Sequence, residues 1–222
     1  MKIFNLGEDN TILNQYVAEL RDVNIQKDRM RFRRNIERIG ELMAYEISKT
    51  LTYSKKEVQT PLGIASVNTP DDELVIATVF RAGLPLQSGF LQVLDHADCA
   101  FVSAFRYYKD QDHRAVDVKI EYIAAPLLSN KTLLLVDPML ATGESMELAW
   151  KAFLTKGAPK KMHIACVIAS VDGVKHLQKL FADDVNDNIT LWCATIDPGM
   201  NEHKYIVPGL GDAGDLSYGD KI

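Results

Sequence analysis

The segment from Lys131 to Trp150, KTLLLVDPMLATGESMELAW, holds the residues with the clearest chemical potential. An apolar run typical of a buried strand ends at Asp137, a short loop follows, and a helical pattern begins near Ser145. The first turn of a helix has N–H groups without intrahelical partners and a partial positive charge, which favour a bound phosphate. The segment therefore predicts an anion site, and an ordinary strand-to-helix turn capped by Ser145 is the alternative.

The polar residues of this loop fit a sugar phosphate. Thr142 and Ser145 offer hydroxyl donors, and Gly143 permits a positive φ and a close approach of the phosphate. Asp137, at the end of the strand, can accept hydrogen bonds from vicinal ribose hydroxyls. This loop has neither the GxxxxGK[ST] nor the GxGxxG spacing of common nucleotide-binding loops. The loop could therefore hold a ribose 5-phosphate by both of its ends.

A second informative segment is IDPGMNEHKYIVPGLGDAGDLSY, from Ile196 to Tyr218. A structureless stretch of this length in a compact domain usually has a function. Its glycines can bring backbone N–H and C=O groups against the edge of a small, flat, uncharged ligand such as uracil. Cytosine carries an amino donor at position 4 and would leave a loop N–H unpaired, which is a strong basis for discrimination. A disordered tail is the alternative.

Three motifs resemble one family, the uracil phosphoribosyltransferases. VDPMLATGES closely resembles the family's phosphoribosyl-diphosphate loop, usually DPMLATGGS, and YIVPGLGDAGD resembles its uracil-binding signature. RAGL, from Arg81 to Leu84, resembles its diphosphate loop, where a strained or cis peptide near Arg81–Ala82 is expected. The resemblance covers nearly the whole chain. It implies transfer of the phosphoribosyl group of 5-phosphoribosyl 1-diphosphate (PRPP) to uracil, giving UMP and diphosphate in pyrimidine salvage.

The resemblance also implies a set of site residues. The PRPP contacts would be Arg81, Ala82, Gly83, Arg106, Asp137, Pro138, Met139, Leu140, Ala141, Thr142, Gly143, Glu144, Ser145 and Asp212. The uracil contacts would be Tyr205, Ile206, Gly211, Asp212 and Ala213. Catalysis would fall to Arg81 and Arg106, which stabilise charge on the leaving diphosphate, and to Asp212, which takes the N1 proton of uracil. The cofactor would be Mg²⁺, held mainly by the substrate, with no dedicated protein metal cluster.

Three positions depart from the family pattern. Glu144 stands where glycine is common, and we expect its side chain to point to solvent, with its backbone alone serving the phosphate. RYYKDQD follows where RxEET is usual after Arg106, so that Lys109 or Arg114 would close over the diphosphate from a flap or lie in a solvated loop. Leu216 replaces a basic residue. Glu144 and the missing RxEET keep open a silent PRPP- or nucleotide-binding regulator. A transferase of the same fold acting on another base is a second rival, and the DPM start and the GLGDAGD loop count against it.

The elements that would position these loops form an α/β fold, the type I phosphoribosyltransferase-like parallel sheet flanked by helices. Apolar strand-like runs are expected at 74–80, 99–105, 132–136, 163–169 and 189–196, with helices at 84–95, 145–156 and 174–181. Residues 11–54 are predicted to be helical, with an apolar stripe from Leu20 to Ile47. The alternating VDVKIEYIAA stretch predicts an exposed hairpin or flap. We expect one domain, residues 1–222.

Composition limits the partners. A net charge of −5 and a pI near 5.6 leave no general positive field for nucleic acid, and no segment reaches the length of a membrane span. Three cysteines without metal spacing favour free thiols and a cytoplasmic location. The arginines between 29 and 38 predict an ion-paired helix face, or else a subunit contact or an effector-phosphate site. The stripe and the resemblance favour a homodimer or higher homo-oligomer, and relatives make a purine nucleotide effector possible.

Overall fold

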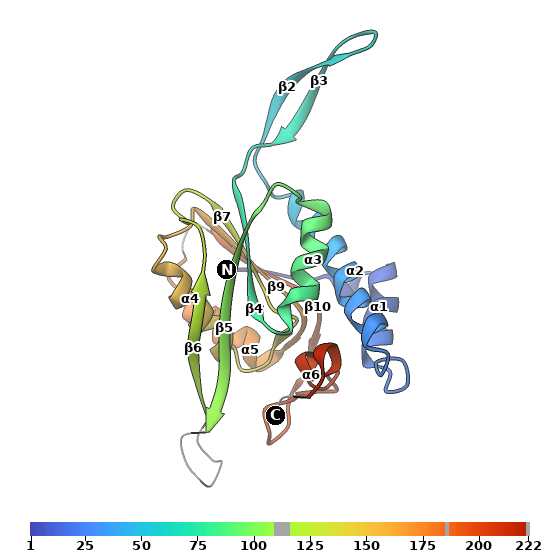
Figure 1. Ribbon diagram of the computed structural model, residues 1–222, viewed down its shortest axis with the longest axis vertical. Helices are drawn as coiled ribbons and strands as arrows, with labels where there is room; N and C mark the ends of the chain where they lie inside the picture. Colours follow the sequence, from blue (N-terminus) through green and yellow to red (C-terminus); the bar gives the residue numbers. More distant parts are fainter. Residues whose placement is uncertain (109–115, 185–186, 221–222) are drawn as a thin grey trace.

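A central sheet of eight strands organises the computed structural model (Figure 1). The strand order is β1-β10-β9-β7-β4-β5-β6, with β8 paired to β9, and only β6 runs antiparallel to its neighbour. The strands are β1 (Lys2–Asn5), β4 (Leu74–Phe80), β5 (Asp98–Tyr108), β6 (Val116–Ala124), β7 (Thr132–Val136), β8 (Met139–Leu140), β9 (Lys161–Ser170) and β10 (Ile189–Asp197). The structure describes residues 1–108, 116–184 and 187–220, with the backbone alone for 104–108 and 116–120. The predicted parallel α/β sheet is confirmed.

Helices cover both faces of this sheet. In Figure 1, α1, α2 and α3 lie on one side and α4 and α5 on the other, and each group packs its own buried cluster against the strands. The helices are α1 (Ile12–Arg21), α2 (Arg29–Ser48), α3 (Gly83–Val93), α4 (Glu144–Leu154), α5 (Val171–Leu180) and α6 (Ala213–Tyr218), with a 3₁₀ turn at Leu6–Glu8. Within the described residues no helix is both long and apolar enough to cross a membrane.

The apolar stripe predicted for the N-terminal helices lies inside the protomer. Leu20, Phe32, Ile36 and Ile47 all have at most 1% of their surface exposed and belong to the cluster between the helices and the sheet. The stripe is therefore buried in the core of a single chain and is not available to a second copy. It gives no support to a homo-oligomer, contrary to the sequence-based argument.

The N-terminal helical region is shorter than the sequence predicted. It consists of α1 and α2 and ends at Ser48, and the chain enters β2 (Tyr53–Thr60) before residue 54. Beyond Ile47 only Leu51 continues the buried stripe, while Thr52, Tyr53 and Val58 favour an extended chain. β2 pairs antiparallel with β3 (Gly63–Pro70), and the two strands form an arm that projects from the body (Figure 1).

The predicted flap is part of the sheet edge. β5 and β6 pair antiparallel from Phe101↔Ala124 to Tyr108↔Val116, so a hairpin is present where alternation predicted one. Lys109 and Arg114, proposed to close over a diphosphate, lie outside the described residues.

Two of the five arginines at the start of α2 form ion pairs of the kind that the sequence predicts. Arg31 holds Glu19 with both nitrogens of its fork, at 2.7 and 2.8 Å, and its hydrogen bonds lower the pKa of Glu19 to about 2. Arg34 pairs with Glu37 at 2.7 Å. Arg33 instead donates to a carbonyl oxygen of α6 at 2.6 Å. This face therefore joins α1, α2 and the C-terminal helix.

A buried histidine makes the fold sensitive to acid. His163 of β9 is 1% exposed, its Nδ1 accepts from the Trp192 indole at 3.2 Å, and its Nε2 has no partner among the described residues. Burial lowers the pKa of His163 from 6.5 to about 4. Because the unfolded chain takes up this proton at a higher pH than the folded chain, stability falls as pH drops from about 6.5 to 4 and the loss ends below that.

We expect this one histidine to lower the free energy of unfolding by about 2 kcal/mol between pH 7.5 and pH 5. The measurement is urea unfolding at both pH values for the wild type and for His163→Gln, whose amide oxygen can still accept from the Trp192 indole. The variant should lose most of this pH dependence. Equal pH dependence in both proteins would show that His163 is not its source.

Candidate functional site

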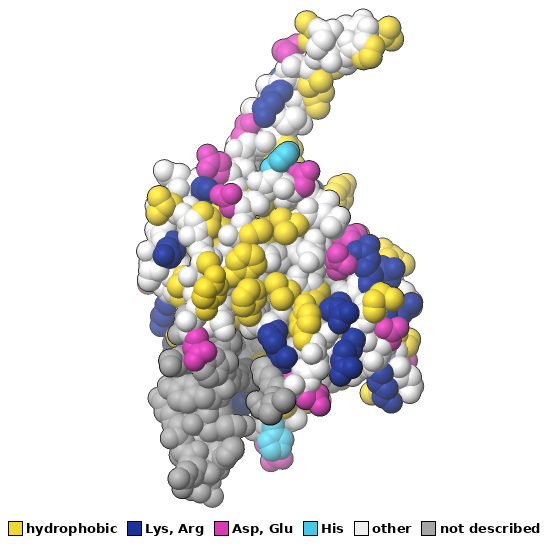
Figure 2. Space-filling view, in the orientation of Figure 1, with side chains coloured by type: hydrophobic (Ala, Val, Ile, Leu, Met, Phe, Trp, Pro, Cys, Tyr) yellow, Lys and Arg dark blue, Asp and Glu magenta, His cyan; other side chains and the backbone are white. Residues whose placement is uncertain are grey.

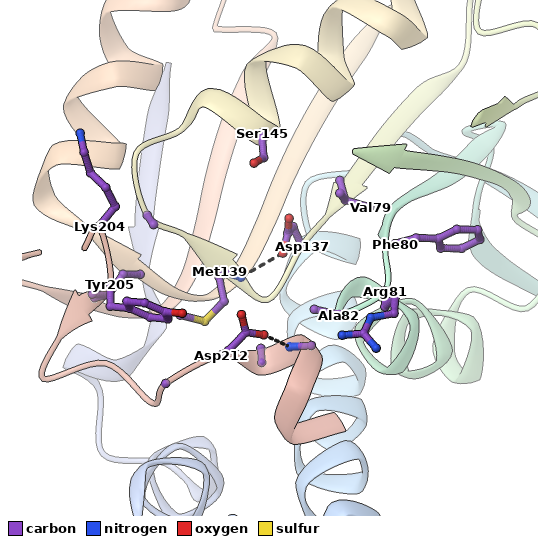
Figure 3. A pocket seen from close by; sticks show the side chains of 15 residues that line it. Val79, Phe80, Arg81, Ala82, Asp137, Met139, Ser145, Lys204, Tyr205 and Asp212 are labelled. Atoms are coloured by element: carbon purple, nitrogen blue, oxygen red, sulfur yellow. Dashed lines mark hydrogen bonds between the residues drawn. The ribbon is translucent and has the colours of Figure 1, made fainter. Parts of the chain in front are cut away.

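One cavity lies at the carboxyl ends of β4 and β7, where ligands bind in sheets of this type. It has a volume of about 220 Å³ and is open to solvent (Figure 3). It is lined by Val79, Phe80, Arg81, Ala82, Asp137, Met139, Ala141, Ser145, Lys204, Tyr205, Ile206, Gly211, Asp212, Ala213 and Gly214. The two informative segments of the sequence, 131–150 and 196–218, therefore meet at one place, although 45 residues separate them along the chain.

The predicted phosphate loop runs from the end of β7 to the first turn of α4. Its start is fixed by the sheet, because the Pro138 carbonyl oxygen accepts from two backbone N–H groups of β9 and the short strand β8 follows. Gly143 then takes φ +87° and stands at the N-cap of α4. A side chain there would meet the His176 ring, because an added Cβ would lie 2.7 Å from its Cδ2. The loop is thereby held with the N-terminus of α4 behind it.

The residues of this loop do not all face the cavity. Asp137, Met139, Ala141 and Ser145 line it, and Asp137 Oδ1 also accepts from the Met139 N–H at 3.2 Å. Leu140 is 1% exposed and packs in the core on the α4 side, so only its backbone is available to a ligand. The predicted set therefore divides into residues at the cavity wall and residues that fix the loop.

Glu144 is exposed, as the sequence argument expected. Its side chain bends back to Thr142, whose hydroxyl donates to Oε2 at 3.2 Å, while the Glu144 N–H donates to that hydroxyl at 3.4 Å. One hydroxyl predicted to serve the phosphate is thus bonded to a carboxylate. Because the Glu144 side chain is exposed, a ligand can displace it at little cost.

Arg81 lines the cavity, but its guanidinium is tied to the C-terminal helix. Nη2 lies 2.8 Å from Oδ1 of Asp215, and Nη1 donates to the Gly219 carbonyl oxygen at 3.1 Å. The peptide bond that precedes it, Phe80–Arg81, is cis, one bond before the position expected. Gly83 lies behind the wall, where an added Cβ would come 2.2 Å from Thr78 Oγ1. The RAGL loop is therefore close-packed, and Arg81 joins it to α6, the helix at the end of the second segment.

The second segment is more ordered than the sequence predicted. It contains two short strands, β11 (Gly199–Met200) and β12 (Ile206–Val207), and the helix α6. Asp212 caps α6: its Oδ1 accepts from Gly214 N–H at 2.8 Å and from Asp215 N–H at 3.0 Å. Its other carboxylate oxygen points toward the cavity (Figure 3). The cap thus fixes a carboxylate at the cavity wall.

One predicted residue cannot be placed in the site, and one residue of the cavity wall was not predicted. Arg106 lies on β5, whose backbone is described, but its side chain lies outside the described residues. Lys204, which the sequence analysis did not select, lines the cavity beside Tyr205. No local motif marks Lys204, and only its place just before Tyr205 could have suggested it.

Comparisons with known proteins agree with this geometry. The uracil phosphoribosyltransferase family model matches residues 8–219. A curated uracil phosphoribosyltransferase of Porphyromonas gingivalis is 55% identical over 222 residues, the whole of both chains, and one of Thermococcus gammatolerans is 34% identical over 96% of this chain and 91% of its own. A solved Aquifex aeolicus structure matches with a TM-score of 0.85 at 28% identity, covering 99% of each chain. The chain belongs to the uracil phosphoribosyltransferase family.

Proposed function

We propose that this protein transfers the phosphoribosyl group of PRPP to uracil, releasing diphosphate and forming UMP. The observation that carries the proposal is the single cavity shared by residues of the 137–145 loop and of the 205–214 segment. A sugar phosphate and a base must lie side by side for the bond between them to form, and this cavity brings the two kinds of loop together.

The phosphate loop holds the sugar in this proposal. The 5′-phosphate lies against the first turn of α4, where free N–H groups and the helix dipole favour an anion. Asp137 accepts from the ribose hydroxyls. The leaving diphosphate faces the loop at 81–83 and the Arg106 strand. Since Arg81 is bonded to Asp215, the backbone of its loop is the more available donor, and Arg81 adds positive charge behind it. Arg106 stays a proposed donor on the strength of the family resemblance.

The C-terminal segment reads the base. Ile206 and Ala213 supply an apolar wall, and Gly211, which has no side chain, leaves its backbone groups free to bond the edge of uracil. Asp212 is the proposed acceptor of the N1 proton, because its second carboxylate oxygen points into the cavity. Tyr205, 48% exposed, lies at the rim, where it can cover the bound base.

Mg²⁺ is the proposed cofactor. Asp137 and Asp212 give the cavity two carboxylates, the hard oxygen donors that this ion accepts directly or through water. Among the described residues no group of three His, Cys, Asp or Glu side chains could hold a metal by itself, so we assign most ligands to the diphosphate and ribose oxygens. Bound there, the ion would neutralise charge on the leaving group.

The test is a direct assay. Purified protein is mixed with uracil, PRPP and Mg²⁺, and UMP and diphosphate are measured. Parallel reactions omit Mg²⁺ or replace uracil by cytosine, hypoxanthine or orotate. We expect UMP only with uracil and Mg²⁺. PRPP binding without turnover of any base would support the silent regulator instead, and turnover of another base would reassign the substrate.

We expect Glu144→Gly to change the KM for PRPP by less than about fivefold, because an exposed charge contributes at most about 1 kcal/mol. Removal of the carboxylate frees the Thr142 hydroxyl, so the small change should be a decrease. Initial rates at saturating uracil measure it. A tenfold or larger decrease would mean that this carboxylate points at the phosphate rather than away from it.

The remaining assignments are proposals of the same kind. We propose a single domain over residues 1–222, because strands from both ends of the chain join one sheet. We place the protein in the cytoplasm, where the free thiols of Cys99, Cys166 and Cys193 stay reduced. A purine nucleotide effector stays a prediction from the family resemblance.

We also propose a homo-oligomer, with the arm as its contact. An isolated two-stranded hairpin is marginally stable in water, yet this arm exposes Leu62 completely and Ile64 to 68%. Figure 2 shows hydrophobic side chains along the arm and on the face of the body below it. A second copy would cover both. Sedimentation of the wild type and of an Ile64→Asp variant tests this proposal, which predicts a smaller particle for the variant.

A further inference from the structure

A turn within the base-binding segment, residues 205–214, is held by an ion pair whose two residues do not line the cavity. Asp197 is the last residue of β10, and its side chain is 5% exposed. Arg21 is the last residue of α1. The two meet through both ends of the fork, with Nη2–Oδ1 at 2.6 Å and Nη1–Oδ2 at 2.8 Å. Such a bidentate pair fixes direction as well as distance.

The pair holds both peptide groups of one glycine. The Gly209 N–H donates to Asp197 Oδ2 at 2.8 Å, and Arg21 Nη1 donates to the Gly209 carbonyl oxygen at 3.0 Å. Gly209 has φ +58°, and an added Cβ would lie 2.1 Å from the Ile206 carbonyl oxygen. Four hydrogen bonds thus join Arg21, Asp197 and Gly209, and Gly209 stands at a position that only glycine can occupy. We call Arg21, Asp197 and Gly209 the turn clamp.

The turn clamp lies between two walls of the cavity. Ile206 precedes Gly209 by three residues and Gly211 follows it by two, and both line the cavity. Arg21 and Asp197 are not among the described residues that line the cavity. The neighbouring Leu210 is also held by α1-side residues, because Gln26 Nε2 donates to its carbonyl oxygen at 3.3 Å. The clamp can therefore act on the base only by placing the backbone that touches it.

We propose that Arg21 and Asp197 are positioning residues for base recognition, and that their pairing sets the affinity for uracil while leaving the sugar phosphate site unchanged. A base read by backbone atoms needs that backbone fixed to within a fraction of an ångström. The phosphate loop is held separately by β9 and α4. The inference rests on the proposed function, since it assigns the base to this segment.

The chain offers a matched control. Arg31 and Glu19 form a second bidentate pair, at 2.7 and 2.8 Å, that also involves α1 and is also partly buried. It joins α1 to α2 rather than to the base-binding segment. Loss of either pair should lower the melting temperature. Only loss of the turn clamp should act selectively on uracil.

The experiment compares Asp197→Asn and Arg21→Gln with Glu19→Gln and Arg31→Gln. For each protein, the KM for uracil is measured at saturating PRPP, and the KM for PRPP at saturating uracil. The first two variants should raise the KM for uracil at least tenfold and change the KM for PRPP less than threefold. The two controls should leave both within threefold. Arg21→Lys, which keeps the charge but loses the fork, should lie between.

A second readout needs no turnover. Hydrogen exchange of a peptide covering residues 205–211 should be at least tenfold faster in Asp197→Asn than in Glu19→Gln, because the Gly209 amide loses its charged acceptor. Uracil KM values within twofold of wild type in both clamp variants would overturn the inference, as would equal rises in both KM values. Absence of UMP from the wild type would instead count against the proposed function, and unchanged exchange at 205–211 would then overturn the clamp as well.

Discussion

Asp212→Asn should lower kcat by about a hundredfold or more while leaving the protein folded, which is the usual range for loss of a general acid or base. The Asp212 carboxylate has two tasks that this substitution separates. Oδ1 caps α6 by accepting from two backbone N–H groups, at 2.8 and 3.0 Å. The asparagine amide oxygen can accept the same bonds, so the helix start and the cavity wall should survive.

The second carboxylate oxygen is the one that points into the cavity (Figure 3). In asparagine that position holds an NH₂ group, which cannot take the N1 proton of uracil and would present donors where an acceptor is needed. The expected result is a low kcat with a KM for PRPP near the wild-type value. Steady-state rates at saturating substrates provide the measurement.

Two further variants make this result specific. Asp212→Ala removes the charge and the cap together and should cost about 1 kcal/mol of stability in addition. Asp28→Asn is the matched control, because Asp28 caps α2 through the same kind of bond, to the Arg31 N–H at 3.0 Å, and does not line the cavity. An Asp212→Asn enzyme that kept most of its kcat would move the base to another group.

The central strands were predictable because each is a continuous apolar run. The β4 and β7 bounds agree with the sequence-based ranges residue for residue, and β9 and β10 differ by one or two residues at their ends. Strands buried on both faces consist mainly of apolar residues, so the change to a polar sequence marks their ends. The phosphate loop was predictable for a related reason, since a strand end, a glycine and a helix start leave few arrangements open.

The arm and α6 were not predictable in this way. The arm has no buried face, so its strands show none of the alternation that marks a half-buried strand. The helix α6 is only six residues long and lies in a glycine-rich stretch, where Asp212 as its cap was the one local signal. Short elements of this kind are stabilised by tertiary contacts rather than by their own propensity.

The same limit applies within the site. The pairing of Arg81 with Asp215 spans 134 residues of sequence, and the turn clamp brings Arg21 to Asp197 across 176. Neither pair has a local pattern. A family motif identifies which residues surround a substrate, but the side chains that hold those residues in place come from wherever the fold delivers them.

Gly143→Ala should raise the KM for PRPP at least tenfold and leave the KM for uracil nearly unchanged. Gly143 has φ +87°, a conformation that costs an L-residue about 1–2 kcal/mol. The added Cβ would also lie 2.7 Å from the His176 ring, which is held in place by Glu147 at 2.7 Å. Because the ring cannot move freely, the loop must shift, and the N–H groups at the start of α4 would no longer converge on the phosphate.

Gly157→Ala separates this effect from a general loss of stability. Gly157 lies just beyond the other end of α4, has φ +102°, and its added Cβ would lie 2.4 Å from Ser129 Oγ. The two variants should therefore lose similar stability in urea, but only Gly143→Ala should weaken the binding of PRPP. If both variants raised the KM for PRPP equally, phosphate binding would depend on the position of α4 as a whole and not on the backbone of the loop. Equal losses of stability with unequal KM values for PRPP would show that the loop backbone binds the phosphate.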